Sequence, residues 1–208
     1  MKISSLHYIT TTPEAAELAC RGGVRWVQLR VKNQSYVAWK QLALETQVVT
    51  RRHGATLLIN DNPRLAQEIG ADGVHLGQAD MPPAEARAML GAKFIIGGTA
   101  NTFADVQRHV AAGVDYVGLG PFRFTQTKEK LSPILGLAGY ADILRQCRAA
   151  GLVVPVIGIG GVTLADVAAL LETGLHGVAV SGAIGAAVEP TATAAQFVER
   201  LALRIPAL

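Results

Sequence analysis

Residues 154–182 read VPVIGIGGVTLADVAALLETGLHGVAVSG, and this stretch contains the unit that decides the fold. The apolar run at 154–157 predicts a short buried strand, and the pattern at 164–172 predicts a helix that ends at Gly174. Apolar residues return at 177–180 and predict the next strand. Strands that alternate with helices pair in parallel through right-handed crossovers, so this unit indicates an α/β fold.

The same strand-then-helix unit recurs along the whole chain. We expect strands at 6–9, 25–29, 55–59, 73–76, 94–96, 116–119, 154–157 and 177–180. The helices that we expect to follow them cover 13–21, 36–53, 63–69, 83–90, 103–112, 137–150, 164–172 and 194–204. Eight such units in 208 residues predict one domain, 1–208, folded as a single (β/α)₈ TIM barrel. An open doubly wound sheet is the alternative, but no glycine-rich dinucleotide fingerprint follows the first strand.

The composition agrees with a barrel enzyme and argues against several other classes of protein. Half of the residues are apolar and only 5% are aromatic, so Val, Ile, Leu and Ala must fill the interior. The net charge is +3, and the densest basic pair, Arg51-Arg52, suits a solvated helix end better than a nucleic-acid contact. Cys20 and Cys147 lie far apart in helical patterns, which predicts buried thiols rather than a disulfide or a zinc site. No apolar stretch reaches the ~18 residues of a membrane span without a charge or a helix-breaking residue, so we expect a cytoplasmic protein without membrane partners.

In a TIM barrel the functional site lies at the carboxyl ends of the strands, so the residues that follow each strand are the candidates. Gln28, Arg30 and Lys32 follow the second strand, and alternation sends them to one face. Two cations and an amide suit a polyanion such as diphosphate, although a solvated strand end is the alternative.

Two acids follow the third and fourth strands. Asp61 and Asp80 could share a Mg²⁺ ion, which is usually held by one or two carboxylates together with substrate phosphates. As alternatives, Asp61 could start a turn and Asp80 could cap the helix that begins near Pro83. For His75, within the fourth strand, a structural role is favoured over that of a catalytic base.

The segments after the fifth and sixth strands are also polar. Gly97 and Gly98 would let the backbone approach a ligand, and Thr99 offers a hydroxyl. Thr102 and Asp105 are spaced to cap the next helix. The longest loop follows the sixth strand, and its Thr125, Thr127 and Lys128 could hold a phosphate or a leaving diphosphate; a disordered surface loop is the alternative.

Glycines cluster after the last two strands. Gly158, Gly160 and Gly161 follow the seventh strand, and Ser181 and Gly182 follow the eighth. The loops after these two strands often form the phosphate site of a TIM barrel, because backbone N–H groups there point at the anion.

Together, these segments resemble the thiamine phosphate synthase family over nearly the whole chain. The matching pieces are QLRVK at 28–32, IND at 59–61, ADGVHLGQADM at 71–81, YVGLGP at 116–121, TQTK at 125–128 and IGIGGV at 157–162. The resemblance implies a Mg²⁺-dependent transferase. Its reaction would join 4-amino-2-methyl-5-hydroxymethylpyrimidine diphosphate to a thiazole phosphate, with dissociative loss of diphosphate, to give thiamine phosphate.

The resemblance also implies a role for each site residue. Residues that would hold the pyrimidine diphosphate are Gln28, Leu29, Arg30, Val31, Lys32 and Asn60, with Thr99 at the family's serine position. Residues that would contact the thiazole phosphate are Thr125, Gln126, Thr127, Gly160, Ser181 and Gly182. Arg30, Lys32 and Lys128 would act in catalysis by neutralising the leaving diphosphate, and Asp61 and Asp80 would bind Mg²⁺.

Some positions depart from the family pattern, and two rival functions remain. Asn101 stands where the family often has His, Arg123-Phe124 replaces Phe-Pro, and Ser181-Gly182 replaces Val-Ser. A thiazole tautomerase on the same barrel would carry a His where Pro121 stands. A non-catalytic phosphate-binding barrel would not need the whole magnesium and diphosphate set. We expect small phosphorylated molecules as partners and no nucleic acid, and a homo-oligomer is compatible with the sequence.

Overall fold

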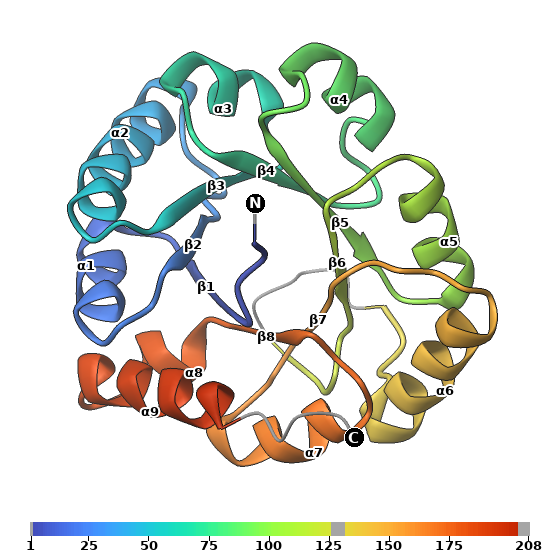
Figure 1. Ribbon diagram of the computed structural model, residues 1–208. Coiled ribbons are helices and arrows are strands. Elements are labelled where there is room, and N and C mark those ends of the chain that lie inside the picture. Colours follow the sequence, from blue (N-terminus) through green and yellow to red (C-terminus); the bar gives the residue numbers. More distant parts are fainter. Residues whose placement is uncertain (1, 126–131, 204–208) are drawn as a thin grey trace.

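The computed structural model describes residues 2–125 and 132–203 and shows a closed barrel surrounded by helices (Figure 1). Its eight strands are hydrogen-bonded in sequence order, β1 next to β2 and so on, and β8 closes the ring against β1. Every neighbouring pair is parallel. The predicted (β/α)₈ barrel is therefore confirmed, and the open doubly wound sheet is excluded.

The strands are β1 (Leu6–Thr10), β2 (Trp26–Leu29), β3 (Thr56–Asn60), β4 (Gly73–Leu76), β5 (Ile95–Ala100), β6 (Tyr116–Leu119), β7 (Val156–Ile159) and β8 (Gly177–Val180). The helices are α1 (Pro13–Arg21), α2 (Tyr36–Arg52), α3 (Pro63–Ile69), α4 (Pro83–Leu90), α5 (Phe103–Ala111), α6 (Gly136–Ala149), the 3₁₀ turn η1 (Leu164–Asp166), α7 (Val167–Glu172), α8 (Gly182–Gly185) and α9 (Pro190–Ala202).

Most predicted boundaries agree with these bounds to within two residues, and the larger differences have physical reasons. Strand β7 begins at Val156 rather than 154, after Pro155, which has no N–H to donate to the ladder. The helix predicted at 164–172 begins as a 3₁₀ turn. The last helix begins at Pro190 rather than 194, because proline suits a first helical position. Strand β5 extends to Ala100, so Gly97, Gly98 and Thr99 lie inside it and not in the following loop.

Alternation along the strands divides the apolar residues between two layers. Side chains such as Leu57, Ile59 and Val74 pack with residues of the surrounding helices. The opposite face fills the barrel with a smaller cluster that includes Trp26 and Tyr116. Residues before β1 cross the amino-terminal end of the barrel, where Ile3 is buried and the ring of His176 hydrogen-bonds its carbonyl oxygen at 2.9 Å (Figure 1). This segment closes the amino-terminal end of the barrel and leaves the carboxyl-terminal end as the mouth.

Several smaller predictions are confirmed. Thr102 and Asp105 form a capping box at the start of α5. Cys20 and Cys147 are both buried and free. Arg51 and Arg52 lie exposed in the last turn of α2. None of the helices in residues 2–125 and 132–203 has the length and apolar character needed to cross a membrane.

Candidate active site

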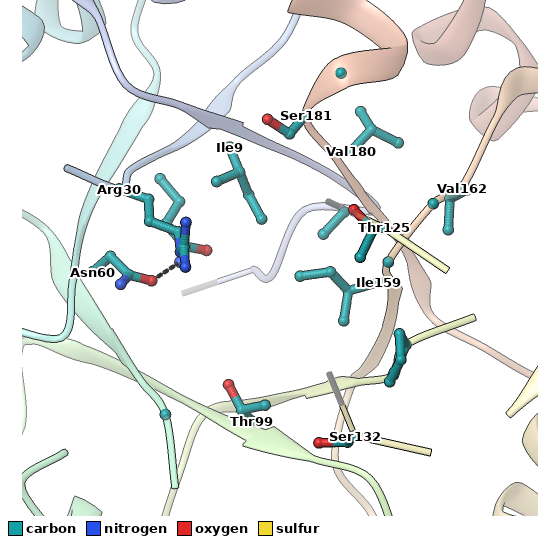
Figure 2. A pocket seen from close by; sticks show the side chains of 18 of the residues that line it. Ile9, Arg30, Asn60, Thr99, Thr125, Ser132, Ile159, Val162, Val180 and Ser181 are labelled. Atoms are coloured by element: carbon teal, nitrogen blue, oxygen red, sulfur yellow. Dashed lines mark hydrogen bonds between the residues drawn. The ribbon is translucent and has the colours of Figure 1, made fainter. Parts of the chain in front are cut away.

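A cavity of about 720 Å³ opens at the mouth of the barrel, where all eight strand ends contribute residues. Its size falls in the usual range for small-molecule sites. The residues that line it are Ile9, Gln28, Arg30, Lys32, Asn60, Asp61, Gly77, Gln78, Ala79, Asp80, Thr99, Gly120, Pro121, Thr125, Ser132, Ile159, Gly160, Gly161, Val162, Thr163, Ala179, Val180, Ser181, Gly182 and Ala183. In Figure 2, Arg30 and Asn60 lie on one side of the cavity, facing Ile159 and Thr125 across it.

The cationic side of the cavity comes from the end of β2. Gln28 is buried and donates a hydrogen bond of 2.5 Å to Asn60 at the end of β3 (Figure 2). Within residues 2–125 and 132–203, the Arg30 guanidinium makes no hydrogen bond or ion pair. A guanidinium that faces a cavity without a protein counter-ion is available to an anionic ligand.

Leu29 and Val31, the two apolar residues of the same segment, do not line the cavity. Both are buried, and their side chains pack in the cluster between the barrel and the helices. Alternation explains this difference, since it turns them away from the face that carries Gln28 and Arg30. Any contact of these two residues with a substrate would have to be made by their backbone.

The two acids predicted to bind metal meet at the same side of the mouth. Lys32 pairs with the Asp61 carboxylate. Asp80 accepts a hydrogen bond of 2.6 Å from the backbone N–H of Gly77. Asp61 has a φ of 63°, a left-handed conformation that few side chains adopt, which fixes where its carboxylate points. The alternative of Asp80 as a helix cap is wrong, because Pro82 occupies the N-cap position of α4 and Asp80 bonds Gly77 instead.

The charges of these acids are coupled. Burial and a hydrogen bond with Asp61 raise the pKa of Asp80 to about 6. Burial opposes ionisation of Asp61 too, but its hydrogen bonds with Asp80 and Lys32 keep the pKa of Asp61 below its usual value. The pair therefore holds one shared proton at mildly acidic pH, the behaviour of two carboxylates pressed together.

This donor set matches a magnesium ion better than a transition metal. Two carboxylate groups adjoin a cavity that the Arg30 and Lys32 side chains also line, and no cluster of three or more His, Cys, Asp or Glu side chains occurs in the described part of the chain. Mg²⁺ typically takes one or two carboxylates and completes its shell with water and substrate phosphates. A cation between Asp61 and Asp80 would also favour the ionised form of Asp80, whose pKa is raised by burial and by the neighbouring Asp61 carboxyl group.

The opposite side of the cavity is built from glycine-rich loops. Gly160 and Gly161 have φ values of 97° and 69°, which favour glycine strongly. A Cβ on Gly160 would lie 2.6 Å from Pro121, so the loop after β7 packs directly on the loop after β6. Ser181 and Gly182 lie at the start of α8, and the space beside Gly182 is open. Thr125 reaches the same cavity, whereas Gln126, Thr127 and Lys128 lie outside the described residues.

The expectation that the two glycines of β5, Gly97 and Gly98, let the backbone approach a ligand is wrong. A Cβ on Gly97 would lie 2.2 Å from the Tyr116 ring, and one on Gly98 would lie 2.5 Å from the His109 ring. Both glycines instead make room for aromatic side chains. Thr99, the next residue, does line the cavity, as predicted.

The structural role predicted for His75 is consistent with its surroundings. The ring is buried, with Nδ1 2.8 Å from the Tyr116 hydroxyl and Nε2 3.0 Å from the Thr99 hydroxyl.

Sequence reasoning missed two features of the site. The apolar wall formed by Ile9, Ile159 and Val180 carries no polar signal, and only the alternation at the strand ends could have identified it. Asn101, considered only as a departure from the family, donates hydrogen bonds to the carbonyl oxygens of Gly120 (2.9 Å) and Pro133 (2.8 Å). It thereby ties together the two ends of the loop between β6 and α6.

Comparisons with known proteins show the family of this chain. The family described as thiamine monophosphate synthase matches residues 3–184. The thiamine-phosphate synthase of Flavobacterium johnsoniae is 53% identical over 183 residues, which cover 88% of this chain and 86% of that protein. The corresponding protein of Phocaeicola vulgatus is 50% identical over 179 residues, 86% of each chain. The solved structure of thiamine phosphate pyrophosphorylase from Pyrococcus furiosus has a TM-score of 0.84 at 25% identity and covers 95% of both chains. This chain belongs to the thiamine monophosphate synthase family.

Proposed function

We propose that this chain is a thiamine-phosphate synthase, which joins a hydroxymethylpyrimidine diphosphate to a thiazole phosphate and releases diphosphate. One observation carries the proposal. Arg30, which has no counter-ion in the described residues, and a coupled pair of acids, Asp61 and Asp80, line the same cavity as the Gly160 and Ser181 loops, and Figure 2 shows Arg30 across the cavity from Ile159. The cavity thus offers a place for a diphosphate and a separate place for a second phosphate.

The cationic side would promote the departure of diphosphate. As the bond between the pyrimidine methylene carbon and oxygen breaks, negative charge grows on the leaving group, and Arg30 and Lys32 are placed to stabilise it. Lys128, by family resemblance, would add a third positive charge. Mg²⁺ held by Asp61 and Asp80 would supply further electrostatic stabilisation of the diphosphate.

The rest of the cavity would position the two organic rings. Gln28 and Asn60 present polar groups to the ring of the pyrimidine, and Ile9 and Ile159 supply apolar walls. The thiazole nitrogen would then attack the methylene carbon with its lone pair, held in place by its phosphate at the Gly160 loop. A C–N bond replaces a C–O bond and no proton is lost, so the reaction needs no general base.

The rival functions are less well supported. A tautomerase must move a proton on the thiazole, yet Pro121 stands where that family carries a His. A non-catalytic phosphate-binding barrel would have no use for a coupled carboxylate pair beside an arginine that has no counter-ion in the described part of the chain. Because its proposed substrates are charged and phosphorylated, we also propose that the enzyme acts in the cytoplasm.

The proposal is tested by mixing the purified chain with both substrates and Mg²⁺ and measuring thiamine phosphate and diphosphate. We expect both products in equal amounts, and no product when Mg²⁺ is chelated. A chain that leaves both substrates intact, or that only isomerises the thiazole, would contradict the proposal.

A further inference from the structure

Three side chains on neighbouring strands form a continuous hydrogen-bonded chain from the barrel interior to the cavity. The Tyr116 hydroxyl on β6 lies 2.8 Å from Nδ1 of His75 on β4, and Nε2 of His75 lies 3.0 Å from the hydroxyl of Thr99 on β5. Tyr116 is fully buried, His75 nearly so, and Thr99 lines the cavity. Figure 2 shows the Thr99 side chain directed into the cavity.

The strands hold this chain in a fixed register. His75 pairs with Gly97, and Gly97 pairs with Tyr116, so these three positions lie at one level of the barrel. Gly97 leaves room for the Tyr116 ring, and Gly118 lies against His75, where a Cβ would come 3.1 Å from the imidazole. Thr99 lies one level nearer the mouth, where the ring of His109 on α5 also hydrogen-bonds its carbonyl oxygen at 2.8 Å.

Only one direction of donation along this hydrogen-bonded chain satisfies the buried Tyr116 hydroxyl. In the described residues, His75 Nδ1 is the one acceptor in hydrogen-bonding range of that O–H group. If Nδ1 carried a proton, it would donate to the phenol oxygen, and the phenol proton would be left without an acceptor in the described residues, which buried groups avoid. Tyr116 therefore donates to Nδ1, the imidazole proton is on Nε2, and Nε2 donates to the Thr99 oxygen.

This direction determines what Thr99 offers to a ligand. With its oxygen accepting from His75, the Thr99 hydroxyl directs its own proton into the cavity. We propose that His75 and Tyr116 are positioning residues that fix Thr99 as a hydrogen-bond donor to the departing diphosphate. The inference rests on the proposed function, since it assigns the donor side of that reaction's leaving-group site. If the hydrogen-bonded chain ran the other way, the Thr99 hydroxyl would donate to His75 and would have only lone pairs left to offer a ligand.

The first test measures the direction of donation along this hydrogen-bonded chain and needs no enzymatic turnover. Nitrogen-15 NMR of the His75 ring separates the two imidazole tautomers, and we expect the proton on Nε2 in the wild-type chain. We expect Tyr116→Phe to abolish this preference. A His75 proton on Nδ1 in the wild type would overturn the inference, whether or not the chain proves to be a synthase.

The second test measures coupling between the residues. Removing one donor from a leaving-group site costs about a hundredfold in rate, so we expect that loss in kcat/KM for Thr99→Val and near wild-type activity for Thr99→Ser. Tyr116→Phe should lower kcat/KM about fivefold, the effect of weakening one hydrogen bond. In the Thr99→Val background, Tyr116→Phe should have no further effect. If Tyr116→Phe lowered kcat/KM by the same factor in the wild-type and Thr99→Val backgrounds, the proposed coupling from Tyr116 through His75 to Thr99 would be contradicted.

Controls separate the loss of the Tyr116–His75–Thr99 hydrogen bonds from a general loss of packing. Tyr8→Phe removes another buried phenol hydroxyl, on the helix-facing side of β1, and should leave kcat/KM unchanged. Binding of inorganic diphosphate with Mg²⁺ gives a readout that needs no turnover, and it should weaken in Thr99→Val and in Tyr116→Phe. Unchanged diphosphate affinity in both variants would overturn the inference. A wild-type chain that binds diphosphate but makes no product would contradict the proposed function instead.

Discussion

At the scale of single residues, the decisive feature is that charges at the mouth are left unbalanced. Arg30 has no protein counter-ion in residues 2–125 and 132–203, and the neighbouring carboxyl groups of Asp61 and Asp80 resist being ionised together. Both features cost stability in the empty protein. They become favourable when an anion and a divalent cation arrive together, as a diphosphate–magnesium complex would.

Arg30→Met should lower kcat/KM by about a hundredfold, because one positive charge is lost at the leaving group. The affinity for thiazole phosphate should stay the same, since Arg30 lies across the cavity from the Gly160 loop. Arg145→Met, at an exposed site on α6, is the matched control and should have no effect on either quantity. Steady-state kinetics with each substrate varied in turn provides the measurement, and a loss confined to thiazole phosphate affinity would place Arg30 on the wrong substrate.

The raised pKa of Asp80 predicts how the stability of the metal-free protein depends on pH. Its pKa is raised to about 6, above the value of about 4 for an unfolded chain, so the folded state binds more protons between these pH values. The stabilising effect of this proton is fully present below pH 4 and is lost as the pH rises through 6. Asp80→Asn should therefore raise the Tm of the chelated protein at pH 8 and change it little at pH 4, while abolishing the response to Mg²⁺. Thermal unfolding in a chelator checks this, and a lower Tm at pH 8 would contradict it.

At the scale of elements, the loops after β6 and β7 work as one unit. Asn101 joins the two ends of the β6–α6 loop, and Gly160 and Gly161 let the β7 loop pack directly against Pro121 and Arg123. Arg123 also pairs with Asp166, at 2.6 Å, in the turn that follows β7. Arg123, one of the two residues that replace the usual Phe-Pro of the family, thus supports the loop by an ion pair.

Gly160→Ala should raise the KM for thiazole phosphate about tenfold and destabilise the fold by ~3 kcal/mol, because a Cβ there meets both an unfavourable φ and the Pro121 ring. Gly151→Ala is the matched control, since Gly151 has a φ of 65° but open space around its Cβ. It should cost only ~1 kcal/mol and leave the KM unchanged. Chemical denaturation and kinetics of both variants provide the measurement, and equal behaviour of the two would remove the loop contact from the account.

At the scale of the whole molecule, the sequence predicted the barrel because each of its elements has a strong local signal. Repeated apolar strands, capping residues and glycines at helix ends placed every unit, and the strand ends then pointed to Gln28, Arg30, Asp61, Asp80 and Thr99. What could not be predicted depends on side-chain contacts between separate elements. The glycines of β5 seemed suited to a ligand, but they accommodate the ring of Tyr116 on β6 and the ring of His109 on α5, and these contacts depend on how the next strand and helix pack against β5.

The same limit applies to three other details of the site. Leu29 and Val31 belong to a conspicuous motif, yet alternation turns their side chains toward the helices. Asp80 looked equally suited to a helix cap until the path of the chain placed it on Gly77. The relay from Tyr116 to Thr99 joins β4, β5 and β6, and no single segment of sequence carries a signal for it.

The proposed function requires that one cavity hold two separate anions, a diphosphate and a phosphate, on opposite sides. A crystal structure of the chain with Mg²⁺, diphosphate and thiamine phosphate tests it most directly. We predict diphosphate in contact with Arg30, Mg²⁺ bound by Asp61 and Asp80, and the product's phosphate at the Gly160 and Ser181 loops. Either anion bound outside this cavity, or both at the same side of it, would contradict the account.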